Sequence, residues 1–575
     1  MSDEDSLIRH TPSLFMAVFV VLFLLAILVL TDYVVSKSRL ASRFIHSSTL
    51  AMFLGLIVGG IVYAVDHREV CTSAAAVARR AAHSASRLRP RSLTHTHTRR
   101  SRPRTVQALK FDPDIFFLYL LPPIIYDTAY KMKRGAFFKN IGLTMALAWG
   151  GTLFSTFAIG TVVYVAGRSG SIFAISFVEC TVFGALISAT DPVSVIAVFE
   201  KKRVNRNLNA VVVGESVLND AVSITLVRVL LDYMEEDATP TAGGFVVTVL
   251  TFVGVFAAAV ALGVAVGLLS ALLHKHVDVY RELGIEALLA VVFPYMSYFL
   301  AEGIHLSGIV SMLFCGMVMA HYTFNNLSIK AQVLTREFFH IYASIAELSI
   351  FIWLGIAVFA YELVFDWPLI FLTITLMLVA RGLHVVPFAL GANFFRTRAA
   401  KKKNRQANNL VTANQLMVLW LAGLRGAVAF ALAASLRTPA ANRILSTTLV
   451  IVFLSVVIIG SSFESLLLAL KVPMGNAVIQ ADQADERETA AAKQAGHGVH
   501  GWDKRVLKPF FTTGAKFRGS ANPYADFAPP RATLATAETD DVELVLNDAN
   551  EIGPENPSRS SSETATTPDR ASNSE

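Results

Sequence analysis

The chain has 575 residues, of which 54% are hydrophobic and only 16% are charged, and its mean hydropathy is +0.53. About a quarter of the residues of a soluble protein are charged, so this composition argues against a soluble protein and indicates one embedded in lipid. The net charge of +7 is no evidence for nucleic-acid binding, because much of it lies in loops between apolar segments. The three cysteines give no sign of a disulfide framework.

Apolar segments that can cross about 30 Å of hydrocarbon recur along the chain and predict an all-α polytopic membrane protein with about 13 transmembrane helices. The acidic start, MSDEDSLIRH, differs from the basic start of a cleaved signal peptide, so the first segment is expected to be retained. In chain order the expected spans are 14–35, 47–66, 112–130, 138–166, 174–199, 207–231, 244–273, 282–301, 305–322, 338–361, 367–393, 411–435 and 444–470.

The loops between these spans alternate in charge. Acidic loops at 232–237 and 361–367 lie on one side of the membrane, and the basic loops lie on the other. Because basic loops face the cytoplasm, the C-terminus is predicted to be cytoplasmic and the N-terminus to be on the outer or lumenal side. The basic loops are 36–43, 131–139, 201–206, 274–281 and 396–405.

Two regions lie outside the pattern of spans. Residues 71–105 are basic and of low complexity in a loop expected on the outer side, which indicates either a loop insertion or non-coding sequence translated in error. Residues 471–575 are rich in Ala, Ser, Thr, Pro, Asp and Glu, and predict a disordered cytoplasmic tail that could bind regulatory proteins. The transmembrane part is therefore expected to cover residues 1–470.

The span at 174–199 contains the sequence SATDPVSV, with Thr190, Asp191 and Pro192 in its middle. Proline removes a backbone donor and disfavours helical geometry in the residue before it, so the helix should break here. The break would expose backbone carbonyls beside the Thr190 hydroxyl and the Asp191 carboxylate. Such hard oxygen donors within a membrane suit a small cation, and broken helices are the usual construction of ion sites in secondary transporters.

The next span contains GESVLNDAVSITL, residues 214–226, which places five polar residues on an apolar helix. They fall within roughly 140° of the helix surface at about 100° per residue. A carboxylate inside a span costs at least about 2.5–3.5 kcal/mol, so such residues usually face the bundle interior and mark an ion path. The other interpretation is that the acids only pair with basic residues to hold helices together. The five residues are Glu215, Ser216, Asn219, Asp220 and Ser223.

A second break is predicted in WLAGLRGAVAF, residues 420–430, where Gly423 and Gly426 flank Arg425. Glycine permits unwinding and close packing, and arginine supplies a fixed positive charge. Two interrupted helices, one in each half of the chain, indicate an inverted repeat with the site between them. Arg381 is a further intramembrane cation whose expected partner is Glu215; the alternative is that it snorkels to the membrane surface.

Three other charged residues lie in or near spans. Glu302 stands beside a very short loop, where contact with water and a place on the ion path are about equally expected, and Glu347 lies within a span. Arg228 lies near the outer end of its helix and is expected to snorkel.

These motifs, together with FFLYLLPPIIYDTAY (116–130), LAEGIHLSGIVSMLFCGMVMAHYTFNNLS (300–328) and AGLRGAVAFALA (422–433), closely resemble the eukaryotic sodium/proton exchangers of the cation/proton antiporter superfamily. The resemblance covers residues 47–470 apart from 71–105, and it is strongest to the organellar branch found in Golgi and endosomes. It implies the inverted-repeat antiporter fold, in which two discontinuous helices cross at mid-membrane.

The resemblance also implies a homodimer with no nucleic-acid partner. Its ion-transport core would comprise 138–231 and 367–470, and its dimerisation part 14–130 and 282–361. The ion-binding acid would be Asp220. Glu215 and Arg381 would form a structural ion pair. The residues expected near the ion are Asn219, Asp191, Thr190 and Ser216, supported by Arg425, Pro192, Gly423 and Gly426.

The resulting hypothesis is an electroneutral antiporter, with no cofactor, that exchanges Na⁺ or K⁺ for H⁺ and regulates pH and cation balance. One carboxylate would hold either a proton or a cation, with Asp220 and Asp191 as the Na⁺ or K⁺ ligands, and Asn219 in place of a second acid implies one cation per proton. An endomembrane location is favoured over the plasma membrane. The alternatives are an electrogenic or K⁺-preferring antiporter, a cation channel and an inactive scaffold; no nucleophile–base pair or metal cluster supports an enzyme.

Overall fold

A computed structural model of the protein describes residues 23–31, 33, 47–65, 111–132, 134–191, 193–235, 242–277, 279–402, 410–475 and 507–512. Residues 1–522 form one compact unit and residues 523–575 a second, and every described residue belongs to the first. Pro192, the segment 71–105 and most of the expected tail lie outside the described residues, so the predictions made for them stay predictions.

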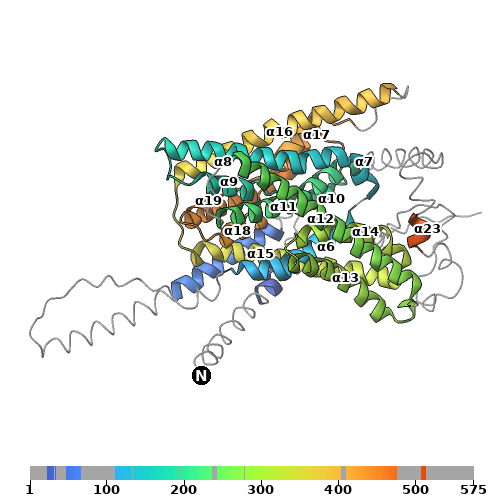
Figure 1. Ribbon diagram of the computed structural model, residues 1–575. Helices are drawn as coiled ribbons and strands as arrows, with labels where there is room; N and C mark the ends of the chain where they lie inside the picture. Colours follow the sequence, from blue (N-terminus) through green and yellow to red (C-terminus); the bar gives the residue numbers. More distant parts are fainter. Residues whose placement is uncertain are drawn as a thin grey trace, which may run out of the picture. The chain divides into compact units, whose positions relative to one another are not determined.

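The described part of the chain is helical (Figure 1), apart from turns and one isolated backbone bridge. Within it, 8 helices are long and apolar enough to cross a membrane, and α9 and α14 are shorter apolar helices. The first two helical segments are 23–31 and Ser47–Val65. The labelled elements up to the middle of the chain are α5 (Pro113–Ile115), η1 (Phe116–Leu120), α6 (Leu121–Lys131), α7 (Arg134–Met145), η2 (Ala146–Gly151), α8 (Thr152–Arg168), α9 (Phe177–Ser188), α10 (Val193–Lys202), α11 (Arg206–Glu235) and α12 (Ala242–His276).

The second half continues in the same way. Its elements are η3 (Val279–Arg281), α13 (Leu283–Gly303), α14 (Gly308–His321), η4 (Thr323–Asn326), α15 (Ile329–Ala360), α16 (Trp367–Lys402), α17 (Ala413–Leu421), α18 (Ala427–Ser435), α19 (Ala441–Leu454), η5 (Ser455–Gly460), α20 (Ser461–Ala469) and α23 (Lys508–Phe511). Because η2 and η5 are single π-helical stretches, α7 to α8 and α19 to α20 each form one long helix.

The prediction of an all-α membrane protein is confirmed, and each expected span coincides with a helical segment, although the count of about thirteen spans stays a prediction. Two helices extend beyond their expected ends. α15 begins at Ile329 rather than 338, and α16 continues to Lys402 rather than 393. The added turns are rich in Lys, Arg, Gln and Ala, which favour helix but lie outside the apolar segment that hydropathy detects.

Both predicted interruptions are present. α9 ends at Ser188, and the chain is not helical from Ala189 to Asp191; α17 ends at Leu421, and α18 begins only at Ala427. The two breaks meet, because the Asp191 N–H donates to the Leu424 carbonyl over 2.8 Å. The prediction of two discontinuous helices that cross at their breaks is therefore confirmed.

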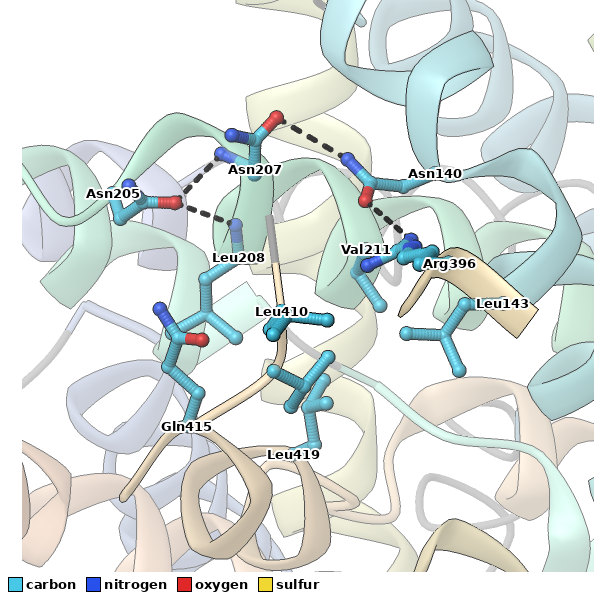
Figure 2. Close-up of a pocket in the computed structure, with 11 residues that line it drawn as sticks. Asn140, Leu143, Asn205, Asn207, Leu208, Val211, Arg396, Leu410, Gln415 and Leu419 are labelled. Carbon is cyan, nitrogen blue, oxygen red and sulfur yellow. Dashed lines mark hydrogen bonds between the residues drawn. The ribbon is translucent and has the colours of Figure 1, made fainter. Parts of the chain in front are cut away.

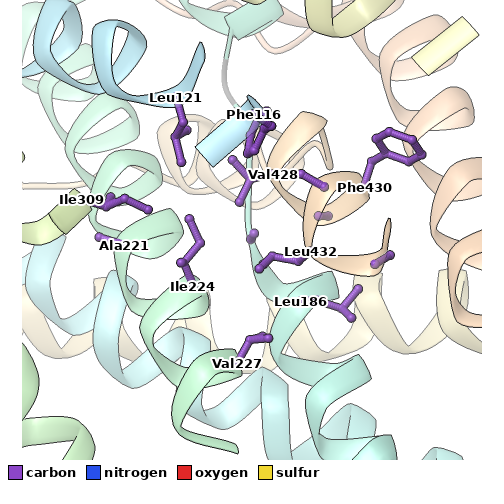
Figure 3. Close-up of a cluster of buried hydrophobic side chains, with 14 of the residues drawn as sticks. Phe116, Leu121, Leu186, Ala221, Ile224, Val227, Ile309, Val428, Phe430 and Leu432 are labelled. Atoms are coloured by element: carbon purple, nitrogen blue, oxygen red, sulfur yellow. The ribbon is translucent and has the colours of Figure 1, made fainter. Parts of the chain in front are cut away.

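An apolar cluster fixes α11 in the middle of these elements (Figure 3). Side chains from η1, α6, α9, α14 and α18 converge on one face of α11, and they are fully or almost fully buried. This close packing places the polar stripe of α11 against the two breaks. The cluster includes Phe116, Leu121, Leu186, Ala221, Ile224, Val227, Ile309, Val428, Phe430 and Leu432.

Within the tail, which was expected to be disordered from residue 471, two short pieces are ordered. Residues 471–475 follow α20 and form an isolated bridge between Met474 and Val204. Residues 507–512 contain the short helix α23. Composition alone does not show that a few apolar residues find a surface to pack against, and disorder of the tail stays a prediction.

Candidate functional site

The polar stripe of α11 lies against the break between α9 and α10. The Asn219 Nδ2 donates to the Ser188 carbonyl (3.0 Å) and to the Thr190 Oγ1 (3.1 Å). The Ser216 hydroxyl donates to the Thr190 carbonyl. Both side chains are buried, so they replace the hydrogen bonds that the unwound turn has lost. Asn219 and Ser216 therefore hold the break in one conformation.

Asp220 follows Asn219 and presents a carboxylate to the same region. Its Oδ1 atom is buried and has no hydrogen-bond partner among the described residues. The other groups that act on it electrostatically are Asp191 and Arg425. A buried carboxylate oxygen without a donor is costly unless a proton or a cation satisfies it. Asp220 is thus the acid in this cluster with an oxygen available to a ligand.

Asp191 lies in the first break, where its backbone is bonded to the second break. Its side chain packs against Gly426, and a Cβ atom at that position would overlap the Asp191 carboxylate. Only glycine allows the backbone of the second break to approach so closely. Gly426 therefore lets the Asp191 side chain lie directly against the backbone of the second break.

Arg425 joins the second break to the end of α9. Its buried Nη1 donates to the carbonyls of Ser188 (2.9 Å) and Ala189 (3.2 Å), while its own carbonyl accepts from the Ser455 hydroxyl. The Ser188 and Ala189 carbonyls have no partner within the helix because α9 ends there. A cation is also favourable at a helix C-terminus. Arg425 thus caps α9, although it lies 236 residues after Ala189 in the sequence. Its buried Nε has no hydrogen-bond partner among the described residues.

Glu215 and Arg381 form a buried, bidentate ion pair with distances of 2.9 and 3.1 Å. The Arg381 guanidinium also donates to the carbonyls of Trp420 (2.9 Å) and Leu419 (2.9 Å), which belong to the last turn of α17. A Cβ atom on Gly423 would overlap this guanidinium. Arg381 therefore caps α17 just as Arg425 caps α9, and each broken helix ends on a buried arginine.

Three further residues near this region were not singled out by the sequence. Thr152 donates to the Asn219 Oδ1 over 2.6 Å, and Ser155 contacts the buried His384 at 3.2 Å. A lone Thr, Ser or His in an apolar helix gives no signal of its own.

Arg228 does not snorkel alone. Its Nη1 lies 2.9 Å from both carboxylate oxygens of Glu302. Glu302 also accepts from the Gly308 N–H over 3.0 Å, so its carboxylate is held between α11 and the start of α14. The sequence predicted snorkelling for Arg228 and no contact with Glu302, because water is an adequate partner for a charged side chain near a membrane surface.

One pocket in the described part of the chain lies away from the cluster around Asp220 (Figure 2). It has a volume of about 200 Å³ and lies at the ends of α7, α11 and α16 that join the basic loops. Figure 2 shows Asn140 between the side chains of Asn207 (3.2 Å) and Arg396 (2.9 Å). No residue of the cluster around Asp220 lines this pocket.

The chain is similar to known proteins along most of its length. The family model described as "Sodium/hydrogen exchanger, transmembrane" matches residues 14–469. Sodium/hydrogen exchanger 8 of Homo sapiens is 30% identical over 526 residues, which cover 86% of this chain and 83% of the relative. Sodium/hydrogen exchanger 5 of Arabidopsis thaliana is 39% identical over 371 residues, which cover 63% of this chain and 69% of the relative.

The solved structure of the sodium proton antiporter MjNhaP1 from Methanocaldococcus jannaschii at pH 8 has a similar fold. The TM-score is 0.55 at 18% identity, over 80% of this chain and 99% of that chain. At this identity the likeness concerns the fold alone. The match of the family model over most of the chain and the extended similarity to the human relative decide the family: the chain belongs to the transmembrane sodium/hydrogen exchangers.

Proposed function

We propose that this exchanger moves Na⁺ or K⁺ in one direction and H⁺ in the other through a single site built on Asp220. The observation that carries the proposal is the buried Asp220 Oδ1, which has no donor among the described residues and lies where two broken helices meet. One carboxylate oxygen can hold a proton or a cation, but not both at once. Competition for that oxygen couples the two ions.

The cation would bind between Asp220 and Asp191, with the Thr190 hydroxyl close by. These are hard oxygen donors, which suit Na⁺ and K⁺. Asn219 and Ser216 would hold the Thr190 turn in place rather than bind the ion, because their donors are already bonded to that turn. The ions are substrates of the protein, and no cofactor is part of this mechanism.

Asn219 supports an exchange of one monovalent cation per proton. Its amide donates to Ser188 and Thr190 and accepts from Thr152 (2.6 Å) and Ser223 (3.3 Å). Only an amide can donate and accept in this pattern, since an ionised carboxylate has no donor. A single titratable acid therefore remains on this part of α11, and each cycle would carry no net charge.

The two arginine caps support movement of the core as one body. Arg425 ties the end of α9 to the second break, and Arg381 ties the end of α17 to α11 through Glu215. We infer that the parts at 138–231 and 367–470 move together against 14–130 and 282–361 in alternating access, within a homodimer. The resemblance of the motifs to organellar exchangers supports an endomembrane location with a cytoplasmic tail, which can bind regulatory proteins.

The test uses purified protein in liposomes that contain a pH-sensitive dye and an acidic interior. Na⁺ or K⁺ is added outside, with and without a clamp on the membrane potential. We expect cation-dependent alkalinisation that does not respond to the clamp and is lost in Asp220→Asn. Asp232→Asn is the matched control, because Asp232 is an exposed acid on the same helix.

The outcomes separate the competing functions. A current that follows the cation under clamp would indicate electrogenic exchange. Cation flux without any proton movement would indicate a channel. Normal exchange by a folded Asp220→Asn protein would show that the site has been assigned to the wrong residue.

A further inference from the structure

Residues 507–512 of the tail pack on the membrane-embedded part of the chain. This piece contains α23, which Figure 1 shows close to α14, and it contacts the end of α12 and the turn η4. The receptor surface consists of Ala271 and Lys275 on α12 and Tyr322 and Asn326 at η4. We call this surface the tail-docking site.

The apolar part of the contact depends on one of two adjacent phenylalanines. The Phe511 side chain is only 8% exposed, and its ring centroid lies 5.4 Å from that of Tyr322. Phe511 and Tyr322 form a cluster with Ala271, whereas Phe510 is 59% exposed. The two rings have equal hydrophobicity, so only the docked position of Phe511 distinguishes them.

The polar part of the contact holds the backbone of the tail. The Lys275 ammonium donates to the carbonyls of Pro509 (2.7 Å) and Phe510 (2.8 Å). The buried Asn326 Nδ2 donates to Phe511 (2.8 Å) and to Ala271 of α12 (2.9 Å). One amide group therefore joins the tail to α12, and it would lose a buried hydrogen bond if the tail left.

The tail has a second attachment on a different part of the protein. Met474 forms a backbone bridge with Val204, and the Gly475 N–H lies 3.2 Å from the Lys202 carbonyl. Lys202 is the last residue of α10 and Val204 lies in the turn before α11, and both belong to the proposed moving core. The tail is thus fastened to the core at residues 474–475 and to the tail-docking site at residues 507–512.

α12 packs against both parts of the protein. Toward its N-terminal end, Phe252 and Phe256 pack on Trp149 of η2 in the proposed core, with ring centroids 5.2 and 4.5 Å apart. Further along, Gly263 packs on the backbone of Ser311 in α14, where a Cβ atom would overlap the Ser311 carbonyl. Movement of the core against α14 must therefore be taken up along α12.

We propose that the tail-docking site is an internal binding surface for the segment 507–512, and that its occupation slows exchange by fastening α12 to η4. The interactions made by the docked segment exist only while α12 and η4 keep their present arrangement, so they stabilise that arrangement against others in the cycle. A protein or peptide that bound the segment 507–512 would free α12. This inference rests on the proposed function.

The experiment compares Phe511→Ala with Phe510→Ala in the full-length protein. Hydrogen exchange of the peptide that covers residues 507–512 measures docking without any transport. We expect its amides to exchange at least about 10-fold faster in Phe511→Ala than in the wild type or in Phe510→Ala, since undocking exposes them. Asn326→Ala removes the contact from the receptor side and should have the same effect.

Transport is then measured with the same proteins in liposomes. The rate of cation-dependent alkalinisation should rise about 2- to 3-fold in Phe511→Ala and Asn326→Ala and stay unchanged in Phe510→Ala. Equal amide exchange in all four proteins would overturn the docking. Faster amide exchange with an unchanged or slower transport rate would overturn the slowing of exchange. Absence of transport in the wild type would instead count against the proposed function, while the amide-exchange result would still test the docking.

Discussion

Removal of Arg381 should destabilise this protein far more than removal of Arg228, although both arginines are paired with a glutamate at 2.9 Å. The side chains of Arg381 and Glu215 are only 5% and 3% exposed, whereas those of Arg228 and Glu302 are 38% and 26% exposed. An unpaired charge is much more costly away from water. The comparison therefore isolates the effect of burial on one type of ion pair.

The structure gives the expected magnitudes. Arg381→Ala leaves Glu215 buried without its partner, which costs about 3–5 kcal/mol in comparable cases. It also leaves the carbonyls of Leu419 and Trp420 without a donor, each worth about 1 kcal/mol. Arg228→Ala breaks a pair in contact with solvent and should cost about 0–1 kcal/mol.

Thermal unfolding of the purified variants in detergent measures the difference. Arg381→Ala should unfold at a much lower temperature than the wild type, and Arg228→Ala at nearly the same temperature. The double variant Glu215→Ala, Arg381→Ala should lose less than the sum of its single variants, because neither charge is then left alone. An Arg381→Ala protein as stable as Arg228→Ala would refute the structural role of the pair.

Two more predictions concern the site itself. Asn219→Asp removes the hydrogen bonds that the Asn219 amide donates to Ser188 and Thr190. The rate of cation–proton exchange in liposomes should therefore fall at least about 10-fold. Exchange at the wild-type rate, with no electrical current, would contradict the role of the amide. Gly426→Ala should weaken cation binding, because the new Cβ atom would displace the Asp191 side chain. The readout is a higher half-saturating Na⁺ concentration. Gly142→Ala is the control and should behave as the wild type, because there is open space around Gly142. Equal Na⁺ dependence in both glycine variants would argue against close contact at the second break.

The sequence predicted the elements whose cause is local. The break at Asp191 follows from the proline after it, and the break near Arg425 follows from the flanking glycines, so both could be located without a structure. Arg381 could be matched with Glu215 because few charged residues lie deep in the expected spans. Contacts that depend on which helices meet could not be predicted, and the bonds from Arg425 to Ser188 and Ala189 are of this kind.

The sequence was less informative near helix ends and in the tail. Water is an adequate partner for Arg228 at a membrane surface, so nothing in the sequence required a bond with Glu302. Phe510 and Phe511 stand in a tail that is polar over most of its length, and only the receptor surface of Tyr322 and Asn326 decides that one ring is buried. Such contacts come from the fold as a whole.

The charges gathered at the two breaks also determine how the site responds to voltage. Arg425 contributes one positive charge and Asp191 and Asp220 contribute two negative charges, while Glu215 and Arg381 cancel each other. With all of these groups ionised, an empty site would carry one negative charge, and the energy of moving it across a membrane would change by about 2.3 kcal/mol for each 100 mV. One bound Na⁺ or H⁺ would remove this dependence. Under the proposed one-for-one exchange, the balance of ions that this exchanger sets would therefore not depend on the membrane potential.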